Sequence, residues 1–187
     1  MPVEPSQALD ALIHHLRIHA VSTEGGPFRL RSGQMSSWYI DARQTTFAGD
    51  GAPLVGAAVL ERIPGDVDAV GGMTMGADPI ALATAMAAHQ AKRLLNAFSI
   101  RKATKDHGIG GRLVGPVGAG TRVVVLEDTT TTGGALIEAV EVARHEGLEI
   151  VSALSLVDRS GGIVAGRLAD LGIPYTALIT PGLLGVE

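Results

Sequence analysis

The sequence predicts an α/β protein whose central sheet is mostly parallel and is flanked by helices. Short apolar runs alternate with segments of helical periodicity along the 187 residues, as they do in βαβ units. The run Val123–Leu126 is apolar throughout, which is typical of a parallel strand buried on both faces. Polar or glycine-rich stretches follow several of the predicted strands. In parallel sheets such loops lie at the carboxyl ends of the strands, where ligands bind.

The N-terminal region is predicted to form one helix and two short strands. Leu9, Leu12 and Leu16 recur on one helical face, and Ser6 suits the N-cap of that helix. The expected elements are a helix over 6–20 and strands over 28–31 and 38–41, on either side of a turn at Ser32 and Gly33.

From about residue 46 onward, predicted helices and strands alternate. Pro64 and Gly65 end one helix, and Pro79 suits the first turn of an Ala-rich helix. The expected helices cover 53–63, 78–94, a segment ending near 145, and 165–171. The expected strands cover 67–70, 97–100, 122–126, 150–157 and 175–179. We therefore expect one domain over 1–187, with an N-terminal part of about 1–45 and an α/β core of about 46–187.

Composition excludes several classes of function. The net charge of −4 gives no electrostatic reason to expect a nucleic-acid partner. The absence of cysteine excludes disulfides, thiolate catalysis and Cys-based zinc sites. The N-terminus lacks the pattern of a signal peptide, and no apolar stretch is long enough to span a bilayer. We expect a cytoplasmic protein with neither a nucleic-acid nor a membrane partner.

The segment from Val123 to Ala135 indicates a class of substrate. Its apolar run ends at two acids, Glu127 and Asp128, and four threonines and two glycines lead into a helical pattern. Glycines let the backbone approach a ligand, and hydroxyls with the amides of a helix start can bind an anion. The carboxylates would repel a bare phosphate but suit a polyol. Together they favour a phosphorylated sugar over the alternative of a ligand-free turn, and the segment is neither a Walker loop nor a Rossmann fingerprint.

A second segment, from Arg101 to Arg112, concentrates cations between glycines after a predicted strand. A solvated charged loop is the simple alternative. Cations on a glycine-hinged loop at the ligand-binding end of a sheet also suit a departing pyrophosphate, whose charge grows in the transition state.

Three further features carry weaker signals. The stretch Gly71–Pro79 joins a strand to a helix whose amides could hold a phosphate, or it is an ordinary glycine-rich turn. Arg159 could anchor a carboxylate or form a surface ion pair. The segment Phe28–Asp41 could form a lid over a planar ring, or its aromatic residues could belong to the core.

The motifs at 123–135 and 101–108 together resemble the orotate phosphoribosyltransferases, a branch of the type I phosphoribosyltransferases. The first motif is typical of the whole superfamily, whereas the basic loop is more specific to the orotate branch. The elements at 28–41, Gly76–Pro79 and Arg159 also match, so the resemblance runs from about Phe28 to Arg159. It implies a type I phosphoribosyltransferase fold with a small hood formed largely by the N-terminal region.

The resemblance also implies an activity: transfer of ribose 5-phosphate from phosphoribosyl pyrophosphate to orotate, with Mg²⁺ held mainly by the substrate and not by dedicated protein ligands. Lys105 and Asp128 are the implied catalytic residues, and Thr131 and Arg159 the implied orotate ligands. The implied ligands of phosphoribosyl pyrophosphate are Arg101, Lys102, Lys105, His107, Glu127, Asp128, Thr129, Thr130, Thr131, Thr132, Gly133, Gly134 and Ala135. In the resembling enzymes the basic loop reaches the partner's site, which implies a homodimer with shared active sites.

Two departures from the family pattern leave alternatives open. Glu127 stands where many members have Asp, and Gly76 stands where some have a lysine. A phosphoribosyltransferase for another base is one alternative, which Arg159 argues against. A regulator that senses phosphoribosyl pyrophosphate is the other, and it would need a nucleic-acid-binding part that this acidic sequence does not show.

Overall fold

The computed structural model describes residues 7–29, 33, 35–103 and 111–186. Its helices are α1 Gln7–His19, α2 Arg43–Thr46, α3 Gly51–Leu60, α4 Ala77–Gln90, α5 Gly134–His145, α6 Ile163–Asp170 and α7 Pro181–Leu184. Its strands are β1 Val21–Ser22, β2 Phe28–Arg29, β3 Met35–Ser36, β4 Tyr39–Ile40, β5 Ala69–Met73, β6 Asn96–Ile100, β7 Leu113–Val114, β8 Arg122–Thr130, β9 Glu149–Asp158 and β10 Tyr175–Ile179.

The central sheet has six strands in the order β10-β9-β8-β5-β6-β7. All neighbouring pairs are parallel except β6 with the short edge strand β7. From β5 the chain first moves outward to β6 and then returns to β8 on the other side of β5. This reversal makes the carboxyl ends of β5 and β8 the topological switch point, where open α/β sheets bind their ligands. The predicted fold class is confirmed.

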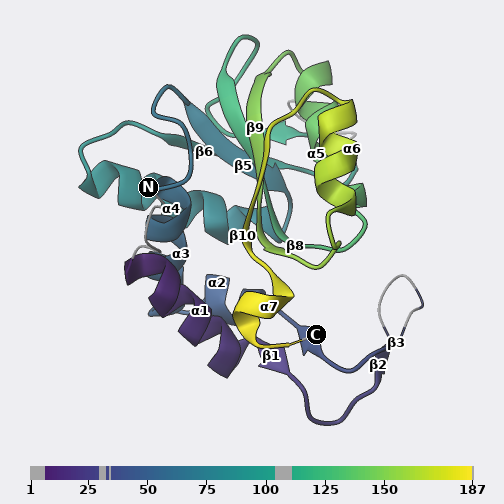
Figure 1. Cartoon of the computed structure of the whole chain (residues 1–187). Helices are drawn as coiled ribbons and strands as arrows, with labels where there is room; N and C mark the ends of the chain where they lie inside the picture. Colours follow the sequence, from purple (N-terminus) through teal and green to yellow (C-terminus); the bar gives the residue numbers. More distant parts are fainter. Residues whose placement is uncertain (1–6, 30–32, 34, 104–110, 187) are drawn as a thin grey trace, which may run out of the picture.

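The two faces of the sheet bury separate hydrophobic clusters. On β8, Val124 and Leu126 belong to the cluster that includes side chains of α1, α3 and α4. Val123 and Val125 belong to the cluster on the face covered by α5 and α6. Figure 1 shows these two helical layers on either side of the strands. The alternation follows from the two-residue period of a strand, and it explains why the run carries no polar residue.

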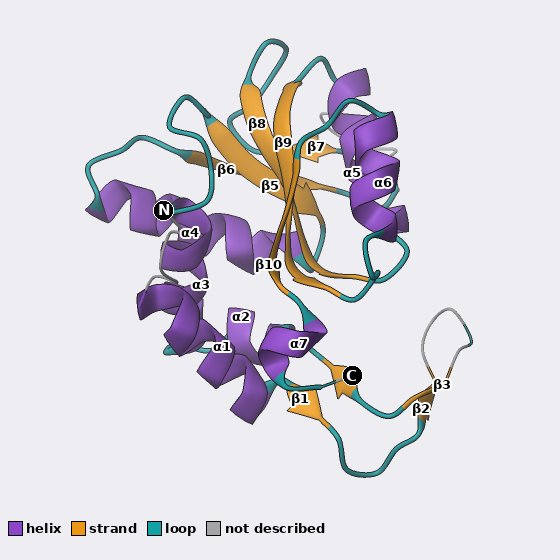
Figure 2. Cartoon of the chain, viewed as in Figure 1, coloured by secondary structure: helices purple, strands orange, loops and turns teal. Residues whose placement is uncertain are grey.

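The N-terminal strands form the hood, which we define as residues 21–40. Its antiparallel pairs are β1 with β4 and β2 with β3. Both predicted segments, 28–31 and 38–41, contain a strand (β2 and β4), and each strand pairs with one that the sequence did not reveal. Figure 2 shows β2 and β3 projecting from the rest of the chain, away from β1.

One strand boundary at the predicted site differs from expectation, and two short elements were not predicted. The predicted strand over 122–126 continues to Thr130, so both acids lie within β8. Backbone pairing with β9 continues through Thr129 and Thr130, and this pairing extends the strand beyond its apolar part. The helix α2 and the strand β7 were not predicted, since each spans four residues or fewer.

No helix among the described residues is both long and apolar enough to cross a membrane.

Candidate active site

The acids Glu127 and Asp128 lie at the carboxyl end of β8, on the sheet's switch point. Glu127 is 8% exposed, whereas Asp128 is more accessible. One carboxylate oxygen of Asp128 accepts a hydrogen bond of 2.7 Å from the backbone N–H of Thr129. This local bond fixes one oxygen of the carboxylate at the end of the strand.

The turn between β5 and α4 lies directly against these acids. A Cβ atom at Gly76 would sit 2.7 Å from both Cγ and Oδ1 of Asp128, so glycine alone leaves room for the carboxylate. The turn is braced by a 2.7 Å hydrogen bond from the Thr74 hydroxyl to Asp78. The stretch Gly71–Pro79 therefore belongs to the same site as the acids, with the first turn of α4 beside it.

The loop from Thr131 to Gly133 joins β8 to α5 and is shaped by contacts with α6. Gly133 has φ +78°, and a Cβ there would lie 2.9 Å from Cγ2 of Val164. Arg167 of α6 donates a 2.5 Å hydrogen bond to the carbonyl of Thr132. Gly134 and Ala135, at the first positions of α5, are exposed. The loop thus presents hydroxyls and helix-start amides on the accessible side, the arrangement that binds phosphate.

Arg159 connects the end of β9 to the hood. Its backbone N–H donates to the carbonyl of Thr130 at 2.8 Å, which brings it beside the end of β8. Its guanidinium lies 3.8 Å from the ring centroid of Trp38 and donates to the Ser36 hydroxyl at 3.2 Å. Burial lowers the pKa of Arg159. Trp38 is buried, so this aromatic residue packs on the arginine instead of lying open as a lid.

Asp158, the residue before Arg159, is held by two hydrogen bonds. The Tyr175 hydroxyl donates to Asp158 Oδ2 at 3.0 Å, and the backbone N–H of Ser160 donates to Oδ1 at 2.6 Å. Burial raises the pKa of Tyr175, and the charges of Asp158 and Glu127 raise it further. These contacts fix the chain at the point where Arg159 leaves the strand.

The basic loop begins at the carboxyl end of β6, one strand beyond β5 from the acids. The backbone N–H of Arg101 donates to the carbonyl of Arg112 at 2.8 Å, which closes the base of the loop. Arg112 in turn donates to the Arg101 carbonyl at 2.6 Å and pairs with Glu138 of α5. Lys102 is exposed. Lys105 and His107, the other predicted cations, lie outside the described residues.

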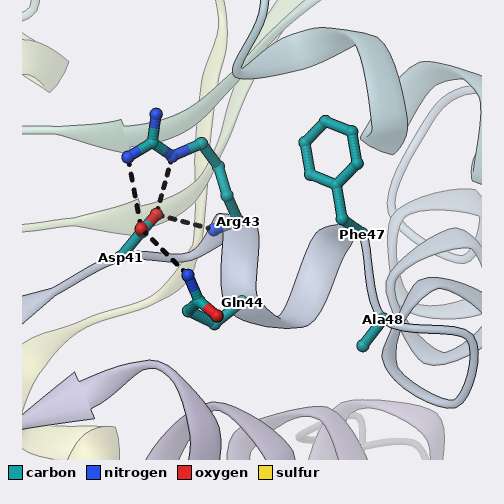
Figure 3. A pocket seen from close by; sticks show the side chains of 5 residues that line it. All are labelled: Asp41, Arg43, Gln44, Phe47 and Ala48. Atoms are coloured by element: carbon teal, nitrogen blue, oxygen red, sulfur yellow. Dashed lines mark hydrogen bonds and ion pairs between the residues drawn. The ribbon is translucent and has the colours of Figure 1, made fainter.

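Sequence reasoning missed a cluster at the start of α2, shown in Figure 3. Asp41 accepts from Nε of Arg43 at 2.7 Å and from Nη2 at 3.2 Å. These residues border an open cavity of about 540 Å³ together with Gln44, Phe47 and Ala48. The only sequence signal was a pair of opposite charges two residues apart after a predicted strand.

The donor atoms around the acids suit magnesium. Mg²⁺ prefers oxygen ligands and keeps several waters, so one or two carboxylates beside a polyanionic substrate are sufficient. Glu127 and Asp128 supply such oxygens at the switch point. Among the described residues, no three His, Asp or Glu side chains converge into a cage.

Known proteins similar to this chain agree in their names. The orotate phosphoribosyltransferase of Streptomyces avermitilis is 43% identical over 178 residues, which cover 95% of this chain and 97% of that protein. The Synechocystis enzyme of the same name is 39% identical over 180 residues, covering 95% of this chain and 88% of the relative. No family model matches the chain.

Solved structures similar to this chain are also phosphoribosyltransferases. A phosphoribosyltransferase from Corynebacterium diphtheriae aligns with a TM-score of 0.84 and 31% identity, over 97% of this chain and 100% of that one. The Mycobacterium tuberculosis orotate phosphoribosyltransferase, in complex with 5-phospho-alpha-D-ribosyl 1-diphosphate, aligns with a TM-score of 0.79 and 30% identity, over 96% and 99% of the two chains. With acids, a threonine-glycine loop and a hood-bound arginine at one sheet edge, and relatives matched over nearly their full length, the chain belongs to the orotate phosphoribosyltransferase family.

Proposed function

We propose that this chain transfers ribose 5-phosphate from phosphoribosyl pyrophosphate to N1 of orotate in a magnesium-dependent reaction. The C1–O bond to pyrophosphate breaks, a C1–N1 bond forms, and the products are orotidine 5′-monophosphate and pyrophosphate. The reaction is a step of pyrimidine nucleotide synthesis. The observation that carries the proposal is the continuous course of β8 from Glu127 and Asp128 into the loop shaped by Gly133.

We propose a role for each part of the β8 end. Glu127 and Asp128 would bind the ribose hydroxyls, and Asp128 would stabilise the positive charge that develops on the sugar. The hydroxyls and amides of residues 129–135 would bind the 5-phosphate. When bound, Mg²⁺ would lie beside Glu127 and Asp128 and would supply positive charge that neutralises the pyrophosphate.

The base would be recognised by Arg159 and Thr131. Arg159 is already oriented by Trp38 and Ser36, so its fork needs little reorganisation to meet a carboxylate. Orotate carries such a carboxylate and uracil does not. This arrangement favours orotate over uncharged bases.

The basic loop would cover the pyrophosphate. Arg101, Lys102, Lys105 and His107 would neutralise the charge on the leaving group, with Lys105 acting in the transition state. The link between Arg112 and Glu138 supports this role, because it ties the base of the loop to α5, the helix that begins at the phosphate loop.

We further propose a cytoplasmic homodimer of single-domain subunits, with the basic loop of each subunit reaching the other's site. One observation supports a subunit contact, and a second supports a single domain. Leu82 and Met86 are one turn apart on α4 and are 59% and 67% exposed, although both are apolar. Leu12 and Leu16 of the N-terminal helix share a hydrophobic cluster with Leu126 of β8, so the N-terminal part packs on the core.

Turnover of phosphoribosyl pyrophosphate with a panel of bases tests the proposed function. With Mg²⁺ present we expect orotate absorbance to fall at the rate of pyrophosphate release, while uracil, xanthine and adenine give little product. Chelation of the metal should stop the reaction. Equal turnover of uracil and orotate would contradict the assignment of the base.

A further inference from the structure

The peptide bond between Thr132 and Gly133 is oriented by a side chain from another element. Nη1 of Arg167, on α6, donates a 2.5 Å hydrogen bond to the carbonyl of Thr132. A trans peptide is planar, and its N–H points in the direction opposite to its carbonyl. Because the carbonyl of Thr132 is directed at the guanidinium, the N–H of Gly133 points away from it. Arg167 therefore determines which side of the loop at residues 131–133 carries this donor.

The helix that carries Arg167 is itself fixed against the loop. The Ser160 hydroxyl accepts a 3.2 Å hydrogen bond from the backbone N–H of Val164, which ties the start of α6 to the segment after β9. Val164 is fully buried, and it lies so close to Gly133 that a Cβ there would sit 2.9 Å from its Cγ2. Residues three apart share a face of a helix, so Arg167 lies on the same side of α6 as Val164. The guanidinium thus reaches Thr132 from a helix face that already packs on the loop.

The oriented peptide lies at the start of α5, where backbone amides lack helical partners. The first hydrogen bond within this helix runs from the N–H of Ile137 to the carbonyl of Gly133 at 2.9 Å. The N–H groups before Ile137 have no partner inside the helix, and such groups together with the helix dipole attract an anion. A cation on the carbonyl side of a peptide also polarises it, and this polarisation strengthens the N–H as a donor.

We propose that Arg167 is a positioning residue for the 5-phosphate of the substrate. It holds the peptide between Thr132 and Gly133 so that the N–H of Gly133 can donate to a phosphate oxygen, and its charge strengthens that donor. The inference rests on the proposed function, in which residues 129–135 bind the 5-phosphate. It extends the phosphate site to α6, which none of the sequence motifs includes.

Equilibrium binding of orotidine 5′-monophosphate and of orotidine, which lacks the phosphate, tests the proposal by calorimetry. Arg167→Ala should weaken binding of the monophosphate by about 3–10-fold, because the loop peptide loses the hydrogen bond that orients it. Binding of orotidine should not change. In initial-rate measurements the KM for phosphoribosyl pyrophosphate should rise by a similar factor, whereas the KM for orotate should stay the same. Arg167→Lys should recover part of the affinity, since an ammonium can donate to the same carbonyl.

Arg144→Ala is the matched control for loss of an exposed arginine. Nη2 of Arg144 donates to the carbonyl of Leu171 at 2.8 Å, at the opposite end of α6 from the loop. This variant should bind both ligands as the unmodified protein does. Equal weakening of both ligands by Arg167→Ala would reveal a general structural effect and would overturn the proposal, as would unchanged binding of the monophosphate. If the unmodified protein binds the monophosphate no more tightly than orotidine, the proposed function is contradicted instead.

Discussion

The side chain of Arg159, the residue after β9, is held by the hood. Its guanidinium stacks on Trp38 and donates to Ser36, residues that lie more than 120 positions earlier in the chain. Cation–π contacts of this kind strengthen as water is removed. A substrate carboxylate bound by Arg159, as we propose, would meet an arginine that the hood already orients.

We expect Arg159→Ala to raise the KM for orotate by about 10–150-fold, because a carboxylate left unpaired loses about 1.5–3 kcal/mol of charged hydrogen bonding. The KM for phosphoribosyl pyrophosphate should change little. Initial rates with each substrate varied in turn provide the measurement. A variant that loses affinity for phosphoribosyl pyrophosphate and keeps its orotate KM would make Arg159 a phosphate ligand.

Gly133 determines the shape of the phosphate loop through its backbone. At φ +78°, an alanine costs about 1–2 kcal/mol, and its Cβ would press on Val164 at 2.9 Å. Gly133→Ala should therefore lower the free energy of unfolding by at least that amount in urea titrations. Gly134→Ala is the matched control, since its Cβ would meet only Thr132 Oγ1 at 3.8 Å and its φ is ordinary. Equal destabilisation of the two variants would show that the left-handed backbone is not the cause.

At the scale of elements, the length of β8 is the feature on which the site depends. Residues 127–130 are acidic or hydroxylic and resemble a loop, yet they pair with β9 as far as Asp158. This pairing projects both acids from a rigid strand, and rigid placement favours binding of a defined ligand geometry. Local sequence could not reveal this extension, because it depends on a strand that is contributed by a later part of the chain.

The same limit explains what else the sequence could and could not predict. The buried strands and longer helices were predicted because their apolar periodicity reports burial directly. The pairing within the hood was not, because strands of two residues carry no periodicity and their partners are chosen by tertiary contacts. The ion pair between Asp41 and Arg43 was missed for a related reason: no motif marks the short helix α2.

The contact between β10 and the end of β9 predicts a dependence of stability on pH. Burial raises the pKa of Tyr175, while in the unfolded chain a tyrosine ionises near pH 10. The folded state therefore keeps a proton that the unfolded state releases. The contribution of Tyr175 to the free energy of unfolding is fully present below about pH 10 and is lost as the pH rises further. The slope is about 1.4 kcal/mol per pH unit for one proton.

Tyr175→Phe removes the ionisable hydroxyl and provides the comparison. Urea unfolding between about pH 9 and pH 11 should show a steeper loss of stability in the unmodified protein than in the variant. At neutral pH the variant should be less stable, because Asp158 loses the donor that now lies 3.0 Å away. Parallel pH profiles for the two proteins would contradict a buried, neutral Tyr175.

At the scale of the whole molecule, the two predicted catalytic residues come from different segments of the chain. Asp128 lies on the most central strands, whereas Lys105 belongs to the segment between β6 and β7, whose closed base Arg112 ties to α5. A group that meets charge formed in the transition state affects kcat more than substrate affinity. Lys105→Ala should therefore lower kcat by about 10²–10³, as loss of one such contact does in other enzymes. A kcat within a few-fold of that of the unmodified protein would indicate that the loop is an ordinary charged surface segment without a catalytic role.

Hybrid dimers test whether the two subunits share their active sites. If Lys105 acts in the partner's site and Asp128 in its own, a hybrid of Lys105→Ala and Asp128→Asn subunits has one site with both defects and one with neither. Random exchange of equal amounts yields hybrids in half of the dimers, so about a quarter of the parent activity should return from two nearly inactive proteins. Subunit exchange is verified separately with a tagged subunit and mass measurement in solution. If exchange is complete and activity stays at the level of the unmixed variants, each subunit provides its own Lys105.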